Sequence, residues 1–325
     1  MTRSPPDGSA LARLQSALDR VGVTDAALQD ADTAHLLVDA HRALSVHDVP
    51  GVEVQVRRRL LGIAVDVRVQ PGAQIANPVH LCFGLSNPFG AQRVRLDVDI
   101  GEGASVRFLA HCLFARTRHA SHRMRARIQV RRDAQLSIEE GHVHGAAGGI
   151  VVTPRARISV GPGARLFSDF SLLQGRVGRL RSDYRVDVAE QGLAELAVRV
   201  RGRAEDRIEL NDHIRLNGIG ARGLVKTRVA LTDRAQAVVR STTEGNAADA
   251  RGHMDCTEIV KDQAQGESVP VVRVGDPKAQ VTHEAAIGTV DQTQLETLMA
   301  HGLTPDQAIE LVISGMLRPA ATEPA

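Results

Sequence analysis

Apolar and polar residues alternate along most of the chain, and the alternating segments recur at a fixed distance. Four segments share one template and begin at residues 65, 96, 126 and 156: VDVRVQPGAQI, LDVDIGEGASV, ARIQVRRDAQL and ARISVGPGARL. In each segment a strand with alternating apolar residues leads to a tight corner, which is followed by an alanine and the start of a second strand. The corner alanines recur at spacings of 31, 30 and 30: Ala73, Ala104, Ala134 and Ala164. Weaker copies follow at residues 186–196 and 214–224.

Alternation with a period of two predicts β-strands, because successive side chains of a strand point to opposite faces. A fixed repeat of this length predicts a solenoid, in which each unit buries its apolar face against its neighbours. Short strands and small aliphatic residues favour a parallel β-helix over a propeller, whose blades usually carry aromatic signatures. We therefore predict a mainly β protein with a β-helix core over residues 51–287. A jelly roll or another sandwich is the alternative.

The two ends of the chain follow a helical pattern instead. Leu11, Leu14 and Leu18 are three and four residues apart, as are apolar residues between Leu36 and Leu44, before Pro50 and Gly51 interrupt the pattern. This spacing predicts an N-terminal helical segment over residues 1–50. Such a segment is suited to covering the exposed end of a β-helix.

The C-terminal pattern predicts a helical hairpin over residues 288–325. Residues 291–300 place leucines and a methionine on one side, and Gly302 stands where a C-terminal cap is expected. Thr304, Pro305 and Gln307 then form an N-cap, a first-turn proline and a capping-box partner. An apolar stripe follows: Ala308, Ile309, Val312 and Met316. The stripe is explained either by packing against the chain's own β domain or by docking of a partner.

Composition and charge exclude several classes of function. Aromatic residues form 2% of the chain, tryptophan is absent, and the formal net charge is +2. A nucleic-acid partner is not expected, because readers of single strands combine basic grooves with stacking aromatics. The N-terminal residues lack a hydrophobic signal core, and no apolar run is long enough to span a membrane. Three widely separated cysteines suit a reducing compartment, so we expect a cytoplasmic protein.

Two polar clusters are candidates for chemistry. In EEGHVHG, Glu140, His142 and His144 alternate and would project from one face of a strand, either around a metal ion or as a hydrogen-bonded surface. In RGHMDCTEIV, Cys256 lies among polar neighbours, including Glu258. A single cysteine in such company is either structural or reactive, and the pattern alone leaves both open.

A third candidate is VTHEAAIG, where His283 and Glu284 are adjacent. A zinc protease would need the motif HExxH, but position 287 is isoleucine, which excludes that class. His283 and Glu284 follow Cys256 by close to one repeat, so successive turns could bring the three together. A thiolate, an imidazole and a carboxylate suit zinc or the iron of a sulfide cluster.

These residues carry a resemblance to a known family. The segments GHMDCTEIV, VTHEAAIG and QLETLMAHGLTPDQAIELVISGML occur in an order and at separations that resemble the SufB/SufD family of iron–sulfur cluster assembly proteins. The resemblance is specific over roughly residues 211–317 and looser elsewhere. It implies a β-helix capped by helices, dimerisation through the β-helix, and C-terminal helices that bind a SufC-type ABC ATPase.

The resemblance also implies a transient iron–sulfur cluster and its ligands. Cys256 matches the family's cysteine position, Glu284 its glutamate position, and His283 the position of the histidine that the second subunit supplies. A homodimer could then build the site from Cys256 and Glu284 of one copy and His283 of the other, and a heterodimer with another SufB/SufD-type subunit is the alternative. Cys82 and Cys112 match no motif of the family and are interpreted as small buried hydrophobic residues.

The resulting hypothesis is a non-enzymatic scaffold for iron–sulfur cluster assembly. The chain has no GxxxxGK[ST] loop, so ATP hydrolysis is expected only in a separate subunit. One alternative is a purely structural subunit that binds the ATPase without metal. The other is a β-helix polysaccharide lyase or hydrolase, which the scarcity of aromatic residues disfavours.

Overall fold

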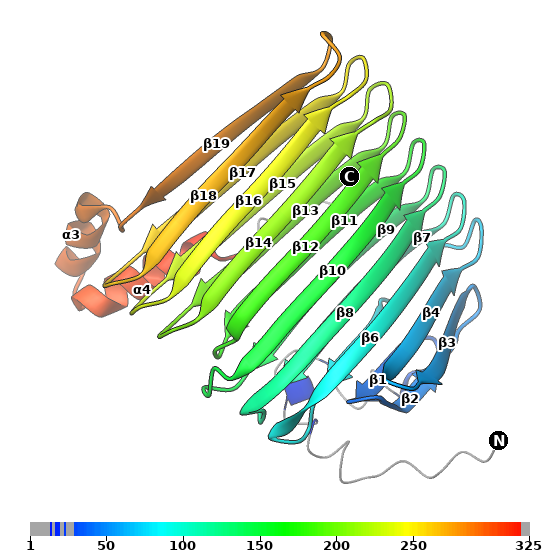
Figure 1. Ribbon diagram of the computed structural model, residues 1–325, viewed down its shortest axis with the longest axis horizontal. Helices are drawn as coiled ribbons and strands as arrows, with labels where there is room; N and C mark the ends of the chain where they lie inside the picture. The colour runs from blue at the N-terminus through cyan, green and yellow to red at the C-terminus, as the bar shows by residue number, and fades with distance from the viewer. Residues whose placement is uncertain (1–13, 15–16, 20–22, 24–28, 320–325) are drawn as a thin grey trace.

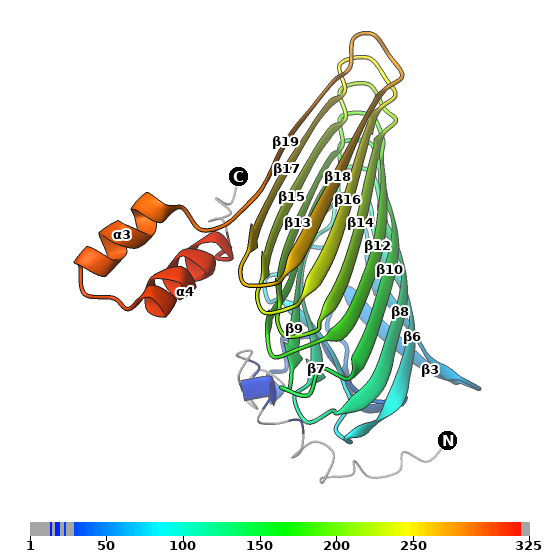
Figure 2. The ribbon, with the colours of Figure 1, turned by 60° about the vertical axis from the view of Figure 1, so that its left-hand side comes forward.

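The computed structural model describes residues 14, 17–19, 23 and 29–319. Nineteen strands in this part of the chain form a flattened parallel β-solenoid of about eight turns (Figures 1 and 2). Each full turn consists of two long strands, one in each of two facing sheets. The predicted mainly β fold with a solenoid core is confirmed.

The first sheet has ten strands, in spatial order β19 (Gln280–Gly288), β17 (Arg251–Val260), β15 (Arg222–Leu231), β13 (Leu193–Gly202), β11 (Arg165–Gln174), β9 (Gln135–His144), β7 (Ser105–Phe114), β5 (Val79–Gly84), β1 (His35–Asp39) and β2 (Arg42–His47). The second sheet has nine, in spatial order β18 (Gln265–Val274), β16 (Gln236–Gly245), β14 (Arg207–Leu216), β12 (Gly178–Val188), β10 (Ile150–Val160), β8 (His119–Val130), β6 (Phe89–Ile100), β4 (Gly62–Val69) and β3 (Val52–Arg59).

The sequence repeat corresponds to one turn of the solenoid. Cys112 of β7 pairs with His142 of β9, and Thr227 of β15 pairs with Cys256 of β17, so the members of each pair are one repeat apart. A residue and its partner one turn later therefore stack directly, with the same side facing inward. Residues far apart in the sequence become neighbours along columns that run the length of the interior.

The tight corners explain the recurring alanines. Ala104, Ala134 and Ala164 are almost fully buried, because each points from its corner into the interior. The residue before the alanine adopts a left-handed backbone, with φ of 55° at Asp133 and 66° at Gly163. Glycine, asparagine and aspartate tolerate this conformation best, which accounts for the corner composition.

The prediction of helix across residues 36–44 is wrong. These residues form β1, β2 and their turn, and β1 pairs in parallel with β5 as part of the first sheet. Leu36 and Val38 face the solenoid interior, whereas Leu37 lies on the outer face against Leu14 and Leu18. Because β1 is buried on both faces, its sequence is a continuous apolar run, which spacing alone does not distinguish from a helix. The solenoid strands thus begin before the predicted boundary at residue 51.

Helical structure near the N-terminus is described only in part. Leu14 and residues 17–19 are helical, which agrees with the spacing of Leu14 and Leu18. Leu11 and most of the chain before Gln29 lie outside the described residues. Leu14 and Leu18 are buried against the outer face of the first sheet, beside Cys82 and Leu113.

Two C-terminal helices form the predicted hairpin. They are α3 (Gln292–Ala300) and α4 (Pro305–Met316). Thr304 caps α4 in a capping box with Gln307, and Gly302 between the helices has a φ of 94°. Helix α4 packs on the outer face of the first sheet, whereas α3 lies farther from the solenoid and buries none of its residues (Figure 2).

Helix α4 is held to the sheet by apolar and ionic contacts. Ile313 and Leu317 pack against Ala230 of β15. The carboxylate of Glu310 is paired with the Arg201 guanidinium of β13, and Asp306 pairs with Lys261 at 3.1 Å. These contacts place α4 across β13, β15 and the end of β17 in the first sheet, whose last strand is β19. None of the described helices is long and apolar enough to cross a membrane.

Candidate functional site

Cys256 lies inside the solenoid near its C-terminal end. Along β17, Met254, Cys256 and Glu258 are directed inward, whereas His253 and Asp255 are directed outward. The Cys256 side chain is almost fully buried, and its Sγ lies 3.7 Å from the hydroxyl of Ser241. The polar segment around Cys256 is thus divided by strand alternation, and only part of it shares a face with the thiol.

The surroundings of Cys256 are polar for an interior. Polar side chains at inward positions of four neighbouring strands are buried in this part of the interior: Asp212, Thr227, Ser241, Thr243 and Glu258. Oδ2 of Asp212 and Oγ1 of Thr243 are buried without a hydrogen-bond partner among the described residues. Buried polar atoms are normally paired, so this polar cluster has donor and acceptor capacity that the described part of the chain does not use.

Burial determines the protonation of these groups. It raises the pKa of the Cys256 thiol, and the nearby carboxyl groups of Asp212 and Glu258 act in the same direction, while the Ser241 hydroxyl opposes them. Burial also raises the pKa of Asp212 to about 7, with a further contribution from Asp183. It raises the pKa of Glu258 to about 7 as well. At neutral pH this polar cluster therefore holds a protonated thiol beside two carboxyl groups that are close to titrating.

His283 and Glu284 lie on β19, which is the neighbour of β17 and the last strand of its sheet. His283 pairs with Met254, Glu284 with Asp255, and Ala285 with Cys256. His283 consequently shares the inward face with Cys256, whereas Glu284 shares the outward face with Asp255. In the described part of the chain, no hydrogen bond or ion pair joins the three predicted ligands, although their strands are adjacent.

The C-terminal end of the solenoid is an open edge. Strands β18 and β19 each have only one neighbour in their sheets, and most of β19 is exposed. Val274 is 51% exposed and Ile287 is 44% exposed at this edge. Unpaired backbone groups and exposed apolar side chains are features of a surface that another chain can cover.

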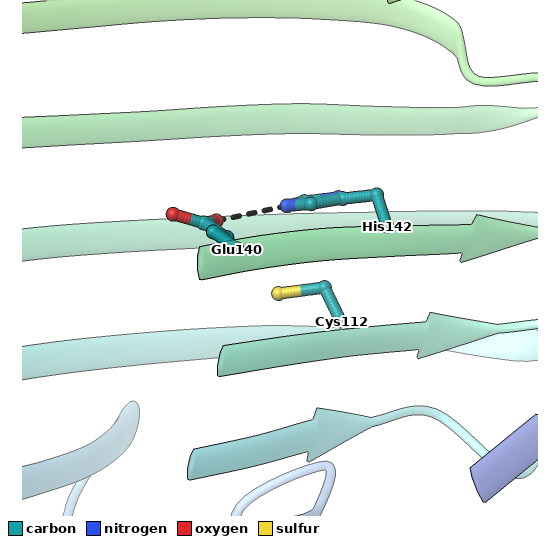
Figure 3. A group of neighbouring side chains, drawn as sticks. All are labelled: Cys112, Glu140 and His142. Carbon is teal, nitrogen blue, oxygen red and sulfur yellow. Dashed lines mark hydrogen bonds and ion pairs between the residues drawn. The ribbon is translucent and has the colours of Figure 1, made fainter. Parts of the chain in front are cut away.

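A second group of candidate ligands lies deeper in the solenoid, between β7 and β9. Cys112, Glu140 and His142 bring a thiol, a carboxylate and an imidazole together (Figure 3). The prediction that Glu140, His142 and His144 share one face of a strand is confirmed, since all three are directed inward. Cys82 and Cys112 are both buried, as predicted. Cys112, however, contacts polar side chains and not only apolar ones.

Comparison with known proteins identifies the family. A family model described as the SUF system iron–sulfur cluster assembly SufBD core domain matches residues 84–316. The chain belongs to the SufBD family. An iron–sulfur cluster assembly SufBD family protein of Methanocaldococcus jannaschii is 34% identical over 282 residues, which cover 87% of this chain and 89% of the relative.

Other relatives extend the comparison within the SufBD family. A SufBD family protein of Pyrococcus horikoshii is 32% identical over 284 residues, covering 87% of this chain and 86% of its own length. The iron–sulfur cluster assembly protein SufD of Bacillus subtilis is 26% identical over 125 residues, covering 38% and 29% of the two chains. Membership supports a role in SUF-type iron–sulfur cluster assembly, and the resemblance seen in the sequence is confirmed.

The buried polar residues around Cys256 were not identified from the sequence alone. Asp212 and Ser241 occupy inward positions of β14 and β16, where most strands carry apolar residues. The signal available in the sequence was a polar residue at an inward position, where most other strands have an apolar residue. The register places Asp212 directly beside Ser241 on neighbouring strands.

Proposed function

We propose that this SufBD family protein is a scaffold on which iron and sulfide are assembled into a cluster, with Cys256 as the thiolate ligand and His283 and Glu284 as further ligands. The observation that carries this proposal is the buried thiol among buried polar side chains next to an open solenoid edge. Iron and sulfide are the cargo. Iron binding would replace the thiol proton, and the carboxyl groups of Asp212 and Glu258 are close enough in pKa to neutrality to take up or release protons there.

A second subunit would complete the site at the open edge. His283 faces inward on β19 and Glu284 faces outward, so pairing of the edge with another chain gives each residue a different neighbour. From the family resemblance we propose that Cys256 and Glu284 of one copy act with His283 of the other in a homodimer, and that a heterodimer with another SufB/SufD-type subunit uses the same edge. Within one chain Glu284 lies on the opposite face of the sheet from Cys256, so this arrangement requires a change at the edge when the second chain binds. The exposure of Ile287 and Val274 supports an interface here.

The C-terminal hairpin is the proposed contact for a SufC-type ABC ATPase. Helix α3 is free to be covered by a partner because none of its residues is buried, and Met299 is 42% exposed. Helix α4 contacts β17 and the residue that follows it through Ile259 and Lys261. Movement of the hairpin by the ATPase would therefore act directly on the strand that carries Cys256.

Anaerobic reconstitution tests the assembly function. The full chain, Cys256→Ser and the matched control Cys82→Ser are each supplied with ferrous iron and sulfide, and bound iron, bound sulfide and the visible absorption spectrum are measured. We expect the wild type and Cys82→Ser to hold cluster and Cys256→Ser to lose most of it. Equal iron and sulfide in Cys256→Ser and wild type would reject the assignment of Cys256.

Co-purification tests the ATPase contact. The chain is co-expressed with a SufC-type ATPase, either as wild type or with Leu295→Asp and Met299→Asp on α3. The control is Ile219→Asp, an exposed position in a solenoid turn away from the hairpin. Loss of the ATPase only with the α3 variants supports the proposed contact, and unchanged capture would contradict it. A chain that captures the ATPase but never holds iron would be a structural subunit without metal.

A further inference from the structure

Cys112, Glu140 and His142 form a compact group in the N-terminal half of the solenoid. Their ligand atoms all lie within 4.8 Å of one another. Cys112 and His142 are register partners on β7 and β9, and Glu140 precedes His142 by two residues, so all three point into the interior (Figure 3). The group is thus positioned by strand pairing and not by a loop.

We propose that Cys112, Glu140 and His142 bind a single divalent transition-metal ion of the zinc or ferrous type. A thiolate, an imidazole and a carboxylate are the donors that such ions take in proteins, and the mixture disfavours magnesium and calcium, which prefer oxygen ligands alone. With the thiol deprotonated, one thiolate and one carboxylate would neutralise the two charges of the ion. Neutrality is important because the Cys112 and His142 side chains are buried.

Hydrogen bonds around the group orient the carboxylate and the imidazole. The Tyr184 hydroxyl donates to Oε2 of Glu140 at 3.0 Å, and Nε2 of His142 lies 2.9 Å from Oε1 of the same carboxylate. Nδ1 of His142 lies 3.5 Å from Nε2 of His144. When the metal occupies Nε2, the single proton of the neutral His142 ring moves to Nδ1 and can be donated to His144. Partners of this kind are typical of the outer shell of metal sites.

The thiol also has a defined neighbour. The amide nitrogen of Gln92 donates to the carbonyl groups of Ala40 and Gly84, so its Oε1 accepts from Nδ1–H of His122 at 2.8 Å. Nε2 of His122 therefore carries no proton, and it faces Sγ of Cys112 at 3.7 Å. The thiol donates its proton in that direction. Metal binding breaks the S–H bond, forms a metal–sulfur bond and releases one proton to solvent, with no change of oxidation state.

The interior has room for an ion beside these groups. A cavity of about 40 Å³ borders the thiol and the carboxylate; Cys112, Glu140 and Tyr184 line it together with Arg155, Ser168 and apolar residues of both sheets, and His142 lies outside this lining. A single buried water needs roughly 10–15 Å³, so a water that serves as the fourth ligand of the ion has room beside the thiol and the carboxylate. The remaining wall is largely apolar, which would exclude further solvent.

This metal site is separate from the proposed assembly site. Cys112 lies on β7 and Cys256 on β17, five strand spacings apart in the same sheet. At about 4.8 Å per spacing, the two thiols are about 24 Å apart. Binding at Cys112 therefore does not depend on Cys256, and each assignment can fail without the other.

Cobalt(II) is the probe for the experiment. The full-length chain is stripped with a chelator and titrated anaerobically with cobalt(II), whose thiolate complexes absorb in the near ultraviolet. In the Cys256→Ser background we expect one ion per chain with a thiolate band. The band should be absent after the further change Cys112→Ser and unchanged after Cys82→Ser. Glu140→Gln and His142→Gln should each weaken binding at least about tenfold, and Tyr184→Phe about tenfold.

Two results would overturn the proposal: a thiolate band that persists in the double variant Cys112→Ser, Cys256→Ser, or its loss in Cys256→Ser alone. Circular dichroism checks that each variant is folded. If Cys112→Ser does not fold, the double variant Cys82→Ser, Cys256→Ser retains Cys112 as its sole cysteine. X-ray absorption of its zinc complex should then show one sulfur ligand at about 2.3 Å, and a spectrum without sulfur would reject the site.

Discussion

The two halves of the solenoid share a backbone but differ in what they bury. The turns around β7 to β9 contain histidines with the aromatic side chain of Phe114, and the turns around β14 to β17 contain non-aromatic apolar residues with Asp212, Ser241 and Cys256. Both halves use the same interior columns. One column runs from Glu140 through Phe170, Val198 and Thr227 to Cys256. The backbone therefore sets where a side chain lies, and the residue chosen at an inward position sets the chemistry.

The halves should also respond to pH in opposite directions. Burial and neighbouring histidines lower the pKa of His122 to about 3 and that of His111 to about 4, and the pKa of His144 is lowered well below its ordinary value. Burial instead raises the pKa of Asp212 to about 7. A fold that depresses a histidine pKa loses stability as pH falls, and a fold that raises a carboxyl pKa loses stability as pH rises.

Acidification should have the largest effect, and it should fall on the N-terminal half. Below a pH of about 6.5 the unfolded chain binds protons that His111, His122 and His144 do not bind in the fold. Each histidine then costs up to about 1.4 kcal/mol of unfolding free energy per pH unit, or about 4 kcal/mol for three. Hydrogen exchange of the chelator-treated chain at pH 7 and 5, corrected for intrinsic rates, should show β7 to β9 opening first. Equal loss of protection in β14 to β17 would contradict this.

Truncating Phe114 should be the next largest perturbation. Its ring is fully buried, with its centroid 5.2 Å from those of His122 and His144. Phe114→Ala should cost about 3–5 kcal/mol through lost apolar burial and the cavity left behind. Urea unfolding measures the cost, and Phe89→Ala, at a ring that is 64% exposed, is the matched control. Similar costs for the two variants would show that the histidine-lined interior is loosely packed.

Asp212→Asn sharpens the comparison in the C-terminal half. Between about pH 4 and pH 7 the folded chain keeps the Asp212 proton that the unfolded chain loses, so stability falls as pH rises through this window. The slope for this group is at most about 1.4 kcal/mol per pH unit. Thermal unfolding of the wild type and Asp212→Asn should diverge between pH 5 and 7.5, with the variant more stable at the higher pH. A constant difference would show that Asp212 is already ionised.

Removing the Arg201–Glu310 ion pair should have the smallest effect. Glu310 is about half exposed, so Glu310→Gln should cost less than about 1 kcal/mol, and the cost should shrink in high salt. Hydrogen exchange of α4 relative to β13 measures docking of the hairpin. A loss of protection throughout the solenoid would mean that α4 supports the fold and not only its own attachment.

The repeat made much of the fold predictable, because the spacing of the corner alanines equals one solenoid turn. It did not predict β1, where an apolar run buried on both faces resembled a helix. Cys256 was identifiable from its motif, but Asp212 and Ser241 required the strand register. Cys112 and His142 are one repeat apart, so the repeat already implied their contact. The interpretation of Cys112 as a small buried hydrophobic residue overlooked this contact, because a buried thiol can also bind a metal ion.

Because the interior columns run through both halves, the number of solenoid turns sets the distance between two groups in the same column. Four register steps separate Glu140 from Cys256, and each step corresponds to one turn of the solenoid. Inserting or deleting one whole turn between β11 and β15 would move the two buried groups by about 4.8 Å while leaving the neighbours of each unchanged. The distance between them therefore changes in steps of one turn, and it can change in evolution or by design without rebuilding either site.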